Sequence, residues 1–181
     1  MRRWVICSIC GNYYALESTQ VISVEYGRAE MKLENVPAYV EGVSVFRGAM
    51  MPLIKVRGLF DMNRNPEPEM SQIVYMNCAG DSIGFRFDSV AEISELPDET
   101  CQKIPVVTIG DKNAYIKGVL KHNGKLVTLL DHNSLIMPKD RKAIADALNV
   151  LRKKEEEARA EEERIAAAKA EAEKKAAEEQ N

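Results

Sequence analysis

Residues 42–56 read GVSVFRGAMMPLIKV, a stretch that is almost entirely apolar. The pair Arg47-Gly48 interrupts what the pattern would otherwise predict to be one buried strand. A second copy of the segment explains the interruption, because residues 118–130 read GVLKHNGKLVTLL. There Asn123-Gly124 is the strongest short signal for a two-residue hairpin turn, and Arg47-Gly48 occupies the matching place. We therefore expect two strands joined by a turn, with the charge of Arg47 in solvent.

The sequence leaves the geometry of the first turn open. A left-handed backbone at Arg47 costs a non-glycine residue roughly 1–2 kcal/mol, whereas a longer or bulged turn avoids that cost.

The repeat extends over most of the chain before Pro138. Residues 39–60 align with 115–136 without a gap, and residues 11–24 align with 80–93 at a slightly shorter offset. Short apolar or alternating runs bounded by Gly, Asn and Asp predict strands in both copies. Two copies of a unit of roughly 60 residues predict two similar subdomains, each a small β-barrel, packed side by side. The fold class is therefore mainly β.

The composition changes after Pro138. Residues 139–181 contain 12 alanines and no glycine or proline, which is typical of a helix. We expect a domain over residues 1–138 and a charged helical tail over 139–181. An apolar stripe that could dock on the domain is formed by Ile144, Ala147, Leu148 and Leu151.

Beyond Arg152 the tail has two interpretations. A weak heptad pattern is formed by Ile144, Leu151, Ala158, Ile165 and Ala172. It is compatible with a coiled coil or a partner-binding helix, but Lys and Glu at companion positions also fit a solvated single helix.

Charge and length exclude several classes of protein. The 181-residue chain has a formal net charge of −3 and no block of Lys and Arg, so a nucleic-acid surface is not expected. The N-terminal apolar run ends at Asn12, too early for a signal peptide or a membrane span. We expect a cytoplasmic protein without direct membrane insertion.

The sequence predicts no catalytic, metal or cofactor site. Cys7 and Cys10 lie three residues apart in a predicted strand, so their side chains face opposite sides and are not expected to bind one zinc ion. We expect these two cysteines, and also Cys78 and Cys101, to be buried reduced thiols. Asp88 and Asp131 each follow an apolar strand, where aspartate caps turns. The two histidines, His122 and His132, are expected at the surface or in packing.

Three blocks of sequence resemble the CheW-type coupling proteins of bacterial chemotaxis. They are NVPAYVEGVSVFRGAMMPLIKVRGLF at 35–60, GFRFDSVAEI at 84–93 and YIKGVLKHNGKLVTLLDHNSLI at 115–136. The resemblance covers residues 3–137. It implies two SH3-like five-stranded β-barrel subdomains in one CheW-like domain, and a non-catalytic adaptor that links the cytoplasmic tips of methyl-accepting chemoreceptors to a CheA-type histidine kinase. Such a protein is recruited from the cytoplasm to membrane receptor arrays.

The resemblance also implies partner-binding residues. In the family a groove between the barrels binds the receptor, and the matching positions here are Val21, Gly42, Ile73 and Ile93, with Arg47 at the nearby hairpin. Two positions depart from the family pattern, since Val45 stands where Asn is common and Lys55 where Asp is common. Because both change polarity on a motif strand, an adaptor of pilus-driven motility or another chemosensory pathway, with a divergent partner, is the alternative.

Overall fold

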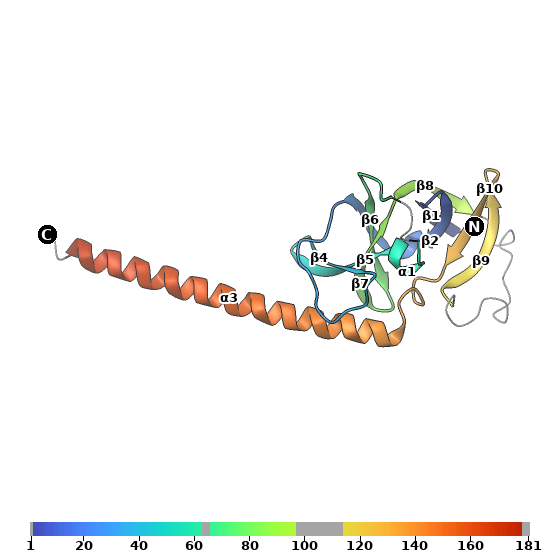
Figure 1. Ribbon diagram of the computed structural model, residues 1–181. Helices are drawn as coiled ribbons and strands as arrows, with labels where there is room; N and C mark the ends of the chain where they lie inside the picture. Colours follow the sequence, from blue (N-terminus) through green and yellow to red (C-terminus); the bar gives the residue numbers. More distant parts are fainter. Residues whose placement is uncertain (1, 63–65, 97–113, 179–181) are drawn as a thin grey trace.

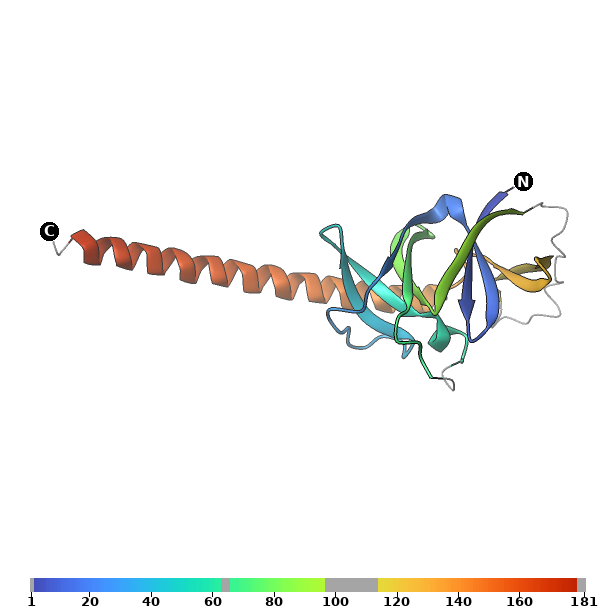
Figure 2. The ribbon, with the colours of Figure 1, turned by 90° about the horizontal axis from the view of Figure 1, so that it is seen from above.

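Two five-stranded β-sheets and a long C-terminal helix form the computed structural model, which describes residues 2–62, 66–96 and 114–178, with side chains up to residue 172. The sheets lie together at one end of the molecule. Helix α3 (Pro138–Glu178) runs beside them and then extends away from them (Figures 1 and 2). Among the helices of the described residues, none has the length and the apolar composition needed to cross a bilayer.

The first sheet has the strand order β8–β1–β2–β10–β9 and the second has the order β3–β6–β7–β5–β4. In chain order the strands are β1 (Arg2–Ile9), β2 (Asn12–Glu17), β3 (Val21–Tyr26), β4 (Val40–Phe46), β5 (Ala49–Lys55), β6 (Gln72–Cys78), β7 (Asp81–Phe87), β8 (Ser89–Leu96), β9 (Ile116–His122) and β10 (Lys125–Leu130). A short helix, α1 (Val56–Leu59), follows β5, and a 3₁₀ turn (Ser18–Gln20) joins β2 to β3. Each sheet contains one parallel pair, β2 with β10 and β5 with β7.

The sequence repeat is present, but the two copies exchange strands. Strands β1–β5 form one copy and β6–β10 the other, and the two sheet orders are identical once each strand is replaced by its repeat equivalent. The hairpin β1–β2 nevertheless pairs with β8 and β10 of the second copy, and β6–β7 pairs with β3 and β5 of the first. The expectation that each copy forms its own subdomain therefore needs correction, because each sheet is assembled from both copies.

Barrel closure is confirmed only in part. In the described residues no backbone ladder joins the edge strands of either sheet. Both sheets nevertheless curl strongly. In the first, His122 Nε2 on β9 lies 2.8 Å from Glu92 Oε1 on β8, the opposite edge strand. In the second, the ring of Phe46 on β4 stacks on Tyr75 of β6 with centroids 4.3 Å apart, although β5 and β7 lie between these strands in the ladder.

Four hairpins share one turn geometry. In each, a two-residue loop has positive φ at both positions, as in a type I′ turn: Cys10-Gly11, Arg47-Gly48, Ala79-Gly80 and Asn123-Gly124. Arg47 is exposed at the tip of the β4–β5 turn, so the predicted turn is confirmed. Its φ of 50° shows that the turn is the tight one with a left-handed backbone at Arg47, not a longer or bulged turn. Cys10 also lies in a turn, not in the strand where the spacing had placed it.

Replacing Arg47 with asparagine is expected to raise the free energy of unfolding by about 1 kcal/mol, because asparagine tolerates the left-handed backbone better than arginine does. Urea denaturation measures the change. The matched control is Asn123→Arg at the repeat-equivalent turn, where φ is 49°, and it should lower stability by a similar amount. A loss of stability in Arg47→Asn would contradict the strain argument.

The main core joins both sheets. Alternate residues of three central strands provide much of it: Val5, Cys7 and Ile9 of β1, Val74, Met76 and Cys78 of β6, and Ile83, Phe85 and Phe87 of β7. Burial raises the pKa of Cys7, and it raises the pKa of Cys78 to about 11, so both thiols stay protonated at neutral pH. The prediction of buried thiols is confirmed for these two, while Cys101 lies outside the described residues.

Only the first turns of α3 pack on the sheets. Ile144 and Leu148 are 3% and 8% exposed, and Ala147 and Leu151 are partly buried, which confirms the predicted stripe. The helix begins at Pro138, a residue favoured at the first helical position. Asp140 in the first turn accepts a 2.8 Å hydrogen bond from the Tyr39 hydroxyl and so ties the helix start to the domain.

Candidate partner-binding surface

The tip of the β4–β5 hairpin presents a cation on an aromatic stack. The guanidinium carbon of Arg47 lies 5.0 Å from the centroid of the Phe46 ring, which stacks in turn on Tyr75. The Tyr75 hydroxyl donates a 3.0 Å hydrogen bond to Ser44 Oγ on β4. Because Phe46 is 4% exposed, the stack is a fixed base from which the Arg47 side chain reaches solvent.

The outer edge of β4 is covered by the segment that precedes it. Val43 exchanges backbone hydrogen bonds with Met31, and the Val45 amide donates a 3.0 Å bond to Glu30 Oε1. Gly42 permits this approach, since a Cβ atom there would collide with the Met31 carbonyl. Its φ of 149° adds a second reason for glycine.

A buried ion pair links α1 to the end of β7. Arg57 donates two 2.6 Å hydrogen bonds to the carboxylate of Asp88, and the Cys10 amide donates a third, of 2.7 Å, to the same group. These bonds to Asp88 raise the pKa of the Arg57 guanidinium. Arg57 also donates to the Pro66 carbonyl at 3.0 Å. Asp88 thus holds together the β1–β2 hairpin, α1 and the β7–β8 corner.

Asp131 and the two histidines also have structural contacts. Asp131 accepts bonds from the Asn133 amide at 3.2 Å and the Ser134 hydroxyl at 3.0 Å, the capping role expected of it. His132 is 7% exposed, and His122 lies beside Glu92. The carboxylates of Asp88 and Asp131 are therefore both engaged in contacts within the fold.

A second group of charges surrounds Lys55 at the end of β5. Lys55 pairs with Glu67, and Arg86 on the adjacent β7 lies 3.2 Å from Glu67 and 3.0 Å from Glu41. The hydrogen bond from Lys55 lowers the pKa of Glu67, with burial opposing it. The positive charge of Lys55 is therefore balanced within the chain.

Apolar side chains are exposed on edge strands β3 and β8, which are equivalent in the repeat. Val21 and Val24 on β3 and Val90 on β8 pack partly buried against the main core. Beside them Ile93 on β8 is 62% exposed and Ile22 on β3 is 37% exposed. Strand β3 lies next to β6, whose Tyr75 carries the Phe46 ring, so the curl of the sheet brings the Arg47 tip toward β3.

A model of the CheW-like domain matches residues 3–138. The chain belongs to the CheW-like family. Among its relatives, "Chemotaxis protein CheW" of Bacillus subtilis (strain 168) is 20% identical over 74% of this chain and 86% of the relative. The protein of the same name from Helicobacter pylori is 25% identical over 65% of this chain and 70% of its own.

A solved structure has the same fold. It is the scaffolding protein TtCheW from Thermoanaerobacter tengcongensis, with a TM-score of 0.68 and 22% identity over 77% of this chain and 90% of that one.

In this CheW-like fold the five residues predicted to bind partners fall into two groups. Arg47 and Ile93 are exposed and Val21 is partly buried, so these three are available to a partner. Ile73 is fully buried with Phe46, Leu53 and Tyr75, and Gly42 is buried under Met31. The side chain of Ile73 and the backbone of Gly42 therefore pack beneath the β4–β5 hairpin and do not face a partner directly.

Sequence reasoning missed the groups that hold this surface. Phe46 directly precedes the turn, and an aromatic residue beside an arginine was a visible signal for a cation–π contact. Tyr75 and Glu30 gave no such signal, because they reach the hairpin only through the curl of the sheet and the bridge at Met31.

Proposed function

We propose that this CheW-like protein is a non-catalytic scaffold that couples cytoplasmic chemoreceptor tips to a CheA-type histidine kinase. The match of the family model over residues 3–138 is the observation that carries the proposal. The curated relatives are chemotaxis proteins, and the solved neighbour is a scaffolding protein, which agrees with such a role. In the cell the protein works in the cytoplasm and is recruited to receptor arrays at the membrane.

Scaffolding requires two surfaces held in fixed geometry. We assign the receptor side to the exposed and partly buried apolar residues of the edge strands β3 and β8, with Val21 and Ile93 as contacts for apolar faces of receptor helices. Arg47 lies at the rim and pairs with a partner carboxylate. The kinase docks on a separate face, so that both partners bind at once.

The direct test is co-precipitation of the full chain with a receptor cytoplasmic fragment and, separately, with the regulatory domain of a CheA-type kinase. Retention of both at micromolar concentrations, without any cofactor, is the expected result. If neither partner is retained at tens of micromolar protein, the coupling function is wrong.

The substitution Arg47→Glu is expected to weaken partner binding by about tenfold or more while leaving the melting temperature nearly unchanged. Reversing the charge replaces attraction by repulsion at the rim, whereas an exposed substitution shifts stability by about 0.5 kcal/mol or less. The control is Lys121→Glu, an exposed change near the equivalent hairpin on β9. Unfolding of Arg47→Glu, or equal binding losses in both variants, would remove Arg47 from the binding surface.

A further inference from the structure

Helix α3 has a second apolar face, which the domain covers only in part and only near the start of the helix. Residues that recur every three or four positions lie along one side of a helix. On this side of α3 they are residues 143, 147, 150, 154, 158, 161, 165, 168 and 172. All are apolar except Lys154 and Glu161. The two large side chains on this face, Val150 and Ile165, are 54% and 49% exposed, and they are the exposed large apolar residues of the described part of α3.

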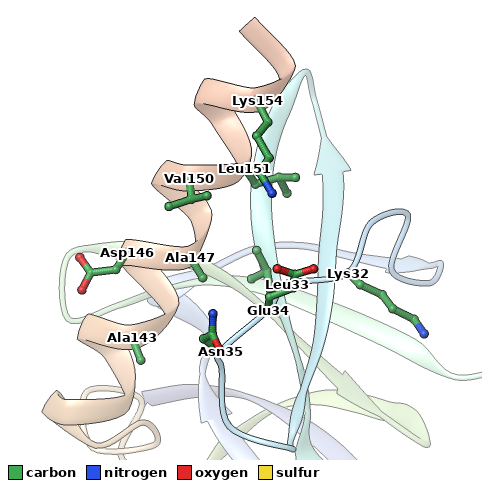
Figure 3. Close-up of a pocket in the computed structure, with 10 residues that line it drawn as sticks. All are labelled: Lys32, Leu33, Glu34, Asn35, Ala143, Asp146, Ala147, Val150, Leu151 and Lys154. Atoms are coloured by element: carbon green, nitrogen blue, oxygen red, sulfur yellow. The ribbon is translucent and has the colours of Figure 1, made fainter. Parts of the chain in front are cut away.

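The lower part of this face lines a groove against the domain. Figure 3 shows Ala147 and Leu151 of α3 on the side of the helix toward Leu33, with Lys154 at the upper end beside the β4–β5 hairpin. Val150 also lines this groove. Leu33, Ala147 and Leu151 are partly buried there, so the groove continues the packing that already fixes the helix to the domain. Beyond Lys154, helix α3 extends away from the sheets (Figure 1). Ala158 and Ile165, which continue the same face, are exposed there.

The spacing of the apolar residues matches a second helix of the same sequence running in the opposite direction. Val150 and Ile165 are 15 residues apart, about 22 Å along the axis at 1.5 Å per residue. An antiparallel pair centred at Ala158 places Ile165 of each copy against Val150 and Leu151 of the other. One symmetric contact, formed twice, thus covers all the large exposed side chains of the face.

The charges and the residue at the centre fit the same alignment. Lys154 and Glu161, the two charged residues of the face, come opposite each other across the pair, again twice. Within its own helix, Glu161 lies 3.8 Å from Arg164 in an exposed contact. Ala158 at the crossing point is small enough to let the two helices approach closely.

We propose that two copies of the chain associate through an antiparallel pairing of their α3 helices, in which the projecting part of each helix enters the groove beside Leu33 of the other. The pair uses the largely exposed side of α3 and the groove beside Leu33, and it involves no residue of β3 or β8. The proposal does not rest on the coupling function, because it is argued from none of the residues assigned to the receptor side.

Cysteine cross-linking of the full chain tests the pairing at its centre. Ala158→Cys is expected to form a disulfide-linked dimer on mild oxidation. Ala160→Cys, two residues away and on the far side of the helix, is the matched control and should give no more dimer than the unsubstituted chain with its native cysteines. Equal cross-linking of both variants, or of neither, with a monomer mass by light scattering at hundreds of micromolar, would overturn the proposal in favour of a solvated single helix.

The direction of the pairing has its own test. A mixture of Val150→Cys and Ile165→Cys chains should give the mixed disulfide, identified by mass spectrometry of the linked peptides. Each variant alone should give little dimer, since its two cysteines would lie far apart in an antiparallel pair. Efficient dimerisation of Ile165→Cys alone would show a parallel coiled coil and contradict the arrangement.

Measurement of the dimer dissociation constant distinguishes an effect on helix pairing from an effect on folding of the domain. Ile165→Glu is expected to raise the dimer dissociation constant by about tenfold or more in analytical ultracentrifugation, because it places a charge against Val150 and Leu151 of the other copy. The melting temperature of the domain should not change, since Ile165 is exposed. Lys154→Glu should weaken the dimer as well, and the double variant Lys154→Glu/Glu161→Lys should restore it; failure of this restoration would contradict the alignment at Ala158.

Discussion

Replacing Asp88 by alanine is expected to lower the free energy of unfolding by about 3–5 kcal/mol. The substitution leaves the Arg57 side chain, which is 7% exposed, as an uncompensated buried charge. It also removes the acceptor of the Cys10 amide in a strained turn. Equilibrium denaturation in urea, followed by circular dichroism, measures the loss.

Two further variants distinguish the contribution of the Arg57–Asp88 ion pair to stability from that of ordinary turn capping. Asp131→Ala, which removes a turn cap and a partly exposed ion pair with Lys117, is expected to cost about 1 kcal/mol. The double variant Arg57→Met/Asp88→Leu should recover most of the stability, because it removes both buried charges together. If Asp88→Ala lowers the free energy of unfolding no more than Asp131→Ala does, the Arg57–Asp88 pair does not hold the two sheets together.

Removing residues from Ala143 onward is expected to lower the free energy of unfolding by about 3–6 kcal/mol, as an upper estimate. The truncation takes away Ile144 and Leu148, which are buried against the core, and exposes the apolar surface beneath them. Removing residues from Lys153 onward should leave stability nearly unchanged, because almost all side chains beyond Arg152 are exposed as far as they are described. Thermal and urea denaturation of both truncated chains give the comparison.

The two truncations are each other's control. Equal melting temperatures would mean that the first turns of α3 contribute nothing to the domain. A large loss on removing residues 153–181 alone would mean that the projecting part contributes to folding, and in that case the dependence of stability on protein concentration would show whether pairing of two chains is the cause.

Local patterns were sufficient for two of the hairpin turns, the helix and the repeat, but not for the turn at Cys10, which was expected to be strand. Asn123-Gly124 and its aligned partner Arg47-Gly48 predicted two hairpins because a two-residue turn depends on only a few neighbouring residues. The same alignment placed Arg47 at an exposed tip, where it is found. The apolar stripe from Ile144 to Leu151 predicted which part of the tail packs, since helical periodicity fixes which residues share a face.

The candidate site was predictable only in part. Val24 aligns with Ile93 in the repeat, yet Ile93 is exposed while Val24 is partly buried. Ile73 looked equally suitable for a groove and is fully buried in the core. Sequence position states which strand a residue belongs to, whereas its exposure depends on the curl of the sheet and on what covers each edge.

The sequence by itself determined most strands, the turns at Arg47-Gly48 and Asn123-Gly124, the docked stripe of α3 and the resemblance to the CheW-like family, because these follow from contacts between residues close along the chain or from short motifs. Tertiary structure alone decided that the hairpins β1–β2 and β6–β7 exchange between the repeats. It also decided that Asp88 pairs with Arg57 and that Glu30 covers the edge of β4. These arrangements join residues distant in sequence, and a strand of either repeat offers nearly the same hydrogen bonds and apolar face, so only the packing of the whole domain selects among them.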